Sequence, residues 1–88
     1  MELYAIIKGR VQGVGFRAAT AKHAKKLYLK GTVRNLTDDS VEIYAQGAQP
    51  NLEQLLENLE KDFSGYVQLT ETDFDQPLRN YTDFNIIE

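Results

Sequence analysis

Glycine and arginine residues near the N-terminus form a segment that could bind an anion. Residues 9–17 read Gly-Arg-Val-Gln-Gly-Val-Gly-Phe-Arg, which places Gly13 and Gly15 just before Arg17. Glycine lets a short loop turn tightly and direct successive backbone N–H groups into one concavity. The guanidinium of an arginine presents a fork of donors that matches phosphate or carboxylate. The segment therefore predicts a cradle for an oxyanion.

The elements on either side of this segment follow from residue periodicity. Residues 2–8 alternate as a strand does, and the stretch from Phe16 to about Tyr28 contains strong helix formers and no breaker. The loop, roughly residues 10–16, would thus join a strand to a helix. The unpaired N–H groups and the dipole of that helix would favour an anion at its N-terminus.

Four more strands and a second helix are expected in the rest of the chain. Residues 30–36 and 41–46 flank turn residues around 36–40, which predicts an antiparallel hairpin. The leucine spacing after Pro50 predicts an amphipathic helix that ends near Gly65. A fourth strand is expected over 66–72, a loop over 73–80 and a short edge strand over 84–87.

This element order predicts one α+β domain over residues 1–88. The order β-α-β-β-α-β is typical of a ferredoxin-like sandwich, in which two helices cover one face of an antiparallel sheet. The first crossover would make strands 2–8 and 30–36 parallel, with strand 41–46 between them. Their carboxyl ends would then lie at the same end of the sheet.

Asn35 is the second residue that we expect at this end of the sheet. It shares a strand face with Val33, so its amide should point to the helix side, toward Arg17. Three ordinary structural roles compete with a functional interpretation. The glycines could form a connection without a ligand, and Asn35 could only terminate the hairpin. Arg17 could pair with a carboxylate such as Asp38 or Glu42.

The available side chains restrict the chemistry of such a site. The chain has no cysteine, and its single histidine, His23, is expected on the helix surface. A guanidinium, backbone N–H groups and one amide could bind a phosphoryl group and place water in line with it. Because no general acid is available, the leaving group must depart unaided, as a carboxylate with a pKa of roughly 4 can. These groups favour an acyl phosphate as substrate.

Two segments resemble the signatures of the acylphosphatase family. Residues 9–17 are similar to the first signature and residues 31–42 to the second. The resemblance implies a metal-independent hydrolase, without a cofactor, that converts an acyl phosphate to a carboxylate and inorganic phosphate. It also implies that Arg17 binds the phosphate and Asn35 positions the attacking water. Backbone N–H groups of the loop would complete the phosphate site, at Gln12, Gly13, Val14, Gly15 and Phe16.

Four residues depart from the family pattern. Thr32 and Ala18 replace residues that are commonly aromatic, whereas Asp39 and Tyr28 stand where a glycine is common. If Asp39 has a positive φ, its left-handed backbone costs about 1 kcal/mol. Neither Arg17 nor Asn35 is affected, so activity is expected. Nothing marks a pocket for a large acyl group, which predicts an exposed site with loose acyl specificity.

Composition restricts the binding partners and the cellular location that we expect for this chain. A net charge of −3 argues against a nucleic-acid partner, and tyrosines such as Tyr4 and Tyr44 are expected to be plain sheet surface. Without cysteines, a membrane-spanning apolar run or a signal-peptide pattern, we expect a cytoplasmic protein. We expect a monomer because no large apolar patch can be placed outside the predicted core. The alternative to an enzyme is a regulatory module that holds phosphate or an acyl phosphate without hydrolysing it. Such a sensor would not need a water-orienting amide at Asn35.

Overall fold

Strand periodicity at the N-terminus produces β1 (Glu2–Gly9), which lies inside the sheet. The computed structural model describes residues 1–88. Leu3, Ala5 and Ile7 are at most 2% exposed because alternate residues of a strand face the same side. The core face predicted for this strand is confirmed.

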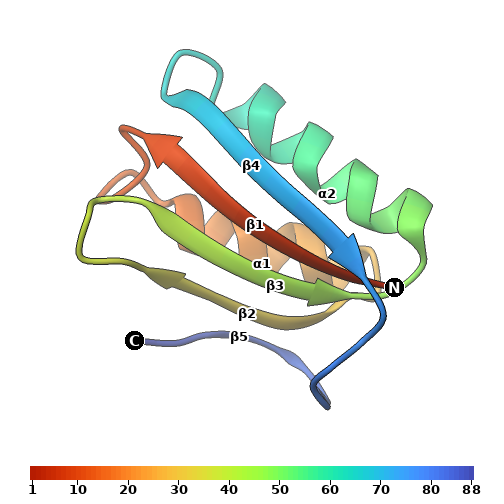
Figure 1. The fold of residues 1–88 in the computed structure, drawn as a ribbon. Coiled ribbons are helices and arrows are strands. Elements are labelled where there is room, and N and C mark those ends of the chain that lie inside the picture. The colour runs from red at the N-terminus through yellow and green to blue at the C-terminus, as the bar shows by residue number, and fades with distance from the viewer.

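Five strands form one sheet in the order β4-β1-β3-β2-β5 (Figure 1). The strands that follow β1 are β2 (Lys30–Asn35), β3 (Val41–Gln46), β4 (Val67–Asp75) and β5 (Phe84–Ile86). Because β3 pairs antiparallel with both β1 and β2, the latter two are parallel and have β3 between them. The predicted topology of the first three strands is therefore confirmed.

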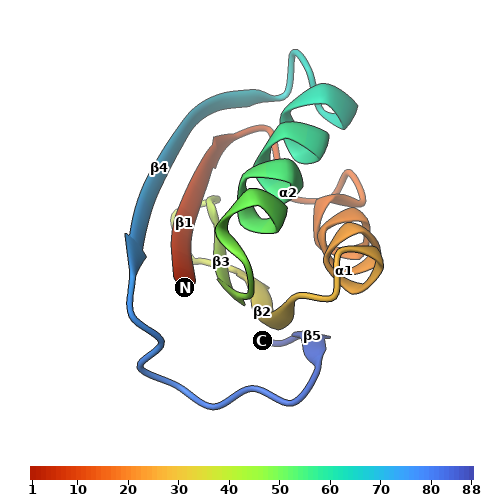
Figure 2. The same ribbon diagram turned by 90° about the vertical axis from the view of Figure 1, so that its right-hand side faces the viewer.

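The sheet is mixed, whereas the sequence predicted an antiparallel one. β4 is antiparallel to β1, but β5 pairs parallel with β2 at the opposite edge. The connection over residues 76–83 crosses one end of the sheet (Figure 2). Because this crossing reverses the chain direction once, β5 is antiparallel to β4 and hence parallel to β2.

Both helices cover the same face of the sheet, as predicted (Figure 2). The residues of α1 (Phe16–Lys26) and α2 (Gln49–Asp62) that face the sheet fill the core between helices and sheet. Phe16, Thr20, Ala24, Leu52, Leu55 and Leu59 are buried there. Small residues on α1 let this helix lie close to the strands, and the leucines of α2 supply most of its buried apolar surface.

The ends of β4 and α2 differ from those predicted. Strand β4 continues to Asp75, where a loop was expected from residue 73, and Asp73 and Phe74 pair with residues of β1. This edge strand is exposed and rich in charge, so its sequence has no clear alternation. Helix α2 ends at Asp62, before the turn that contains Gly65 at φ +88°.

Helix α1 also ends earlier than predicted, because the chain turns into left-handed backbone at Tyr28 (φ +58°). The N–H of Leu29 donates to the carbonyl of Ala24 at 2.9 Å, and the N–H of Tyr28 to that of Lys25 at 3.2 Å. These two bonds define a Schellman motif, which commonly places glycine at the left-handed position. No helix of the structure is long and apolar enough to cross a membrane.

Candidate active site

The glycine loop (residues 10–15) connects β1 to α1 and contains two residues in left-handed backbone. Gly13 has φ +76° and Gly15, the N-cap of α1, has φ +83°. A Cβ at either position would meet no atom within 4 Å, so backbone conformation rather than crowding requires glycine there. The turn geometry expected from the sequence is present.

Consecutive backbone donors of this loop have no partner within the chain. The N–H of Arg10 donates to Tyr66 at 2.9 Å and that of Ala19 to Gly15 at 3.0 Å, but no N–H of residues 12–16 donates a hydrogen bond. The first turn of α1 also contains no acidic side chain. The positive end of the helix dipole is therefore not neutralised beside the free donors.

Arg17 lies beside these donors at the start of α1. It is half-buried and lines a cavity of about 200 Å³ together with Gly13, Gly15 and the β5 residue Ile86. No carboxylate oxygen lies within 4.0 Å of its guanidinium nitrogens. Arg17 is thus available to an anion that the loop holds.

The two carboxylates considered as partners for Arg17 are engaged elsewhere. Glu42 accepts hydrogen bonds from Arg34 Nε at 2.7 Å and from the Tyr4 hydroxyl at 3.1 Å, on the sheet face away from the helices. Asp38 accepts hydrogen bonds from the hydroxyl and the backbone N–H of Ser40. These bonds hold the pKa of Asp38 below its ordinary value. The structural pairing of Arg17 is excluded.

Asn35 ends β2 and lies on the helix side of the sheet. This was predicted because Asn35 and Val33 are two residues apart on one strand and so face the same side. In the sheet register it pairs with Val41, which pairs in turn with Ile7, and both of these residues are buried. Its Oδ1 is buried and is the one buried side-chain polar atom of the chain without a hydrogen-bond partner. Because buried polar atoms are nearly always hydrogen-bonded, this unsatisfied acceptor is an exception within the chain.

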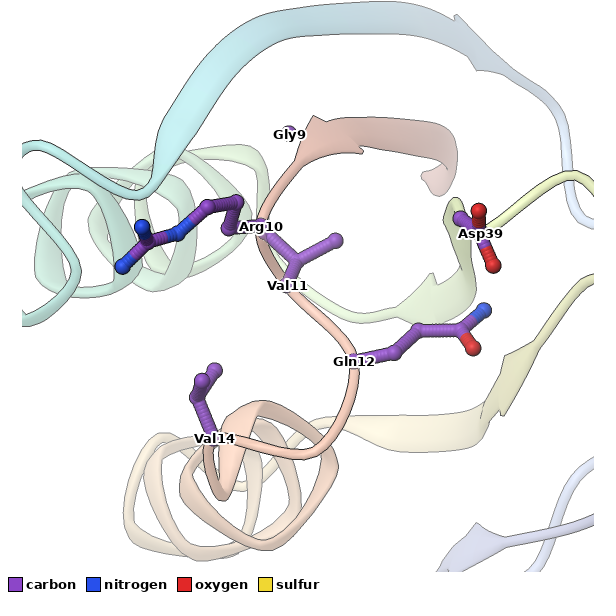
Figure 3. Close-up of a pocket in the computed structure, with 6 residues that line it drawn as sticks. All are labelled: Gly9, Arg10, Val11, Gln12, Val14 and Asp39. Carbon is purple, nitrogen blue, oxygen red and sulfur yellow. The ribbon is translucent and has the colours of Figure 1, made fainter.

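Gln12 connects the glycine loop to the hairpin that carries Asn35. Its Nε2 donates to the carbonyl oxygens of Leu36 at 2.9 Å and Ser40 at 2.8 Å, and Figure 3 shows its amide pointing toward the turn that bears Asp39. Sequence reasoning assigned Gln12 only a backbone N–H and missed this side-chain contact. Asn35 lines neither cavity beside the loop, so Gln12 is the contact that ties the two parts together.

His23 has a structural role that sequence reasoning also missed. Its Nε2 lies 2.6 Å from Asp62 Oδ2, which links α1 to the end of α2. The chain contains no group of three or more His, Cys, Asp or Glu residues that could hold a metal ion.

Comparisons with known proteins point to one family. The family model described as Acylphosphatase matches residues 3–86. The chain belongs to the acylphosphatase family. A curated acylphosphatase from Treponema denticola is 44% identical over 85 residues, which cover 96% of this chain and 89% of that protein. Another, from Paenarthrobacter aurescens, is 39% identical over 89 residues, with coverage of 100% and 95%.

The fold of a solved acylphosphatase is also shared. The crystal structure of acylphosphatase from Bacillus subtilis superposes with a TM-score of 0.91 at 35% identity, over the full length of both chains. Since members of the acylphosphatase family hydrolyse acyl phosphates, the enzymatic class predicted from the sequence is supported.

Two of the four departures from the family pattern, Asp39 and Ala18, lie beside the glycine loop. Asp39 has φ +71°, so the strain predicted for this position is present. Ala18 lines the cavity beside Arg17, where a small side chain leaves the rim open. Thr32 is half-buried opposite Tyr44 of β3, away from the glycine loop.

Proposed function

We propose that this chain hydrolyses acyl phosphates with Arg17 and Asn35 as its catalytic residues. The observation that carries the proposal is the buried Asn35 Oδ1 without a partner, at the same end of the sheet as the free N–H groups of residues 12–16. An anion-binding turn alone would require the donors but not the amide oxygen.

The glycine loop and Arg17 would hold the phosphoryl group. Free N–H groups of Gln12, Gly13, Val14, Gly15 and Phe16 donate to its oxygens, and the helix dipole adds a favourable potential. The guanidinium of Arg17 neutralises charge that builds on the equatorial oxygens as the phosphorus–oxygen bond lengthens. Donors that are already oriented cost little reorganisation during the reaction.

Asn35 would position the nucleophile. Its Oδ1 accepts a hydrogen bond from water and turns a lone pair of that water toward phosphorus. The water oxygen bonds to phosphorus while the bond to the acyl oxygen breaks, and the carboxylate leaves with the electron pair. A proton of the water ends on the released phosphate. Because the leaving carboxylate is weakly basic, the step requires no protein acid.

We further propose that the chain acts as a cytoplasmic monomer without a nucleic-acid partner. The net charge of −3 would repel a polyanion, and the absence of cysteine suits a reducing compartment.

A turnover assay with benzoyl phosphate tests the catalytic assignment. Arg17→Ala is expected to lower kcat/KM by about 100-fold or more, as removal of one transition-state donor does in other enzymes. Asn35→Ala is expected to lower kcat strongly but to leave phosphate binding, measured by calorimetry, nearly unchanged. Lys22→Ala, on the exposed surface of α1, serves as the control and should retain activity.

Wild-type protein that binds phosphate but hydrolyses benzoyl phosphate no faster than buffer would indicate a non-catalytic binding module instead.

A further inference from the structure

A second and larger cavity lies beside the glycine loop. It has a volume of about 330 Å³ and is lined by Gly9, Arg10, Val11, Gln12, Val14 and Asp39 (Figure 3). Val11 also lines the cavity of Arg17, and Gln12 and Val14 belong to the segment with free N–H groups. A phosphoryl group that these N–H groups hold would have this cavity next to it.

Opposite charges lie on the two sides of this cavity. Figure 3 shows the Arg10 guanidinium and the Asp39 carboxylate pointing away from each other on either side of Val11 and Gln12. Arg10 is exposed and pairs with no carboxylate, and its Cζ lies 5.1 Å from the centroid of the Tyr66 ring. This cation–π contact holds the guanidinium at one wall and leaves its N–H donors without a partner in the protein.

We propose that this cavity is the acyl-group subsite and that it favours acyl chains that end in a carboxylate. Arg10 would bind that carboxylate, and the exposed side chain of Val14 would cover the intervening methylene groups. Asp39 would repel an anion on the other side and so direct the acyl chain toward Arg10. The inference rests on the proposed hydrolysis and narrows the loose acyl specificity that the sequence predicts.

Two substrates of equal chain length test this subsite. Succinyl phosphate ends in a carboxylate, and butyryl phosphate has a methyl group in its place. The measured quantity is the ratio of kcat/KM for succinyl phosphate to kcat/KM for butyryl phosphate. A substitution that changes a charge also affects the binding of the phosphoryl group. Because both substrates share this group, that effect cancels in the ratio.

Variants of the two charged residues should shift this ratio in opposite directions. Arg10→Gln is expected to lower it about fivefold, the size of a partly exposed ion pair, and Arg10→Lys should restore most of it. Asp39→Asn should raise it, and asparagine tolerates the left-handed backbone of that position. Lys22→Gln removes the same charge as Arg10→Gln but lies outside the cavity, so it should leave the ratio unchanged.

The outcomes separate this inference from the function on which it rests. Hydrolysis of neither substrate by the wild type would overturn the proposed function, and the subsite with it. Hydrolysis of both, with a ratio that Arg10→Gln and Asp39→Asn leave unchanged, would overturn the subsite alone. Circular dichroism of each variant shows that a changed ratio does not come from unfolding.

Discussion

Among single residues, Gln12 determines how the two halves of the site are joined. Its amide donates to two carbonyl groups of the hairpin, at 2.9 Å and 2.8 Å, and the first of these belongs to the residue after Asn35. Gln12→Leu removes two hydrogen bonds, while each carbonyl oxygen keeps one backbone bond, at Ser40 from the N–H of Leu36 and at Leu36 from the N–H of Asp39. We expect the free energy of unfolding to fall by about 1–3 kcal/mol and kcat to fall while KM changes little.

Urea unfolding and steady-state kinetics of Gln12→Leu measure these two effects. Gln54→Leu is the matched control, since Gln54 makes one hydrogen bond to Asn58 on the exposed face of α2. If Gln12→Leu is destabilised but retains the wild-type kcat, Gln12 supports the fold without positioning Asn35.

At the level of elements, the C-terminus of α1 contains avoidable strain. Tyr28 occupies the left-handed position of a Schellman motif at φ +58° and is 87% exposed, so its ring contributes little packing. Tyr28→Gly should raise the free energy of unfolding by about 1 kcal/mol, because glycine has no left-handed penalty. Tyr28→Ala keeps the penalty and should show no gain in urea unfolding. Equal stability of the two variants would contradict this explanation.

The sequence correctly predicted the elements whose own residue pattern indicates a buried face. Alternation in β1 and the leucine spacing of α2 each indicate one buried face. Alternation along β2 then placed Asn35 on the helix side of the sheet. The extension of β4 was missed because an edge strand pairs through its backbone, and exposed residues such as Asp73 and Asp75 resemble a loop. The side-chain contacts of Gln12 and His23 depend on chain segments distant in sequence, and no local pattern indicates them.

For the whole molecule, the fold concentrates unsatisfied donors at one point of a chain with net charge −3. General electrostatic attraction of phosphate is therefore weak, and binding must come from the glycine loop and Arg17. Binding to the native state alone should raise stability by about 2.7 kcal/mol at phosphate concentrations 100 times the Kd. For a domain of this size, that corresponds to an increase of about 10–20 °C in Tm.

Thermal unfolding of the wild type and Arg17→Ala in increasing phosphate separates specific binding from the general effect of the salt. Phosphate also stabilises folded proteins through its exclusion from their surface, and this contribution should be equal in both proteins. We expect the wild-type Tm to rise along a saturating curve and the Arg17→Ala Tm to rise only slightly and linearly. Parallel curves would mean that the free N–H groups and Arg17 do not form a phosphate site, since a specific site must saturate and must depend on its guanidinium.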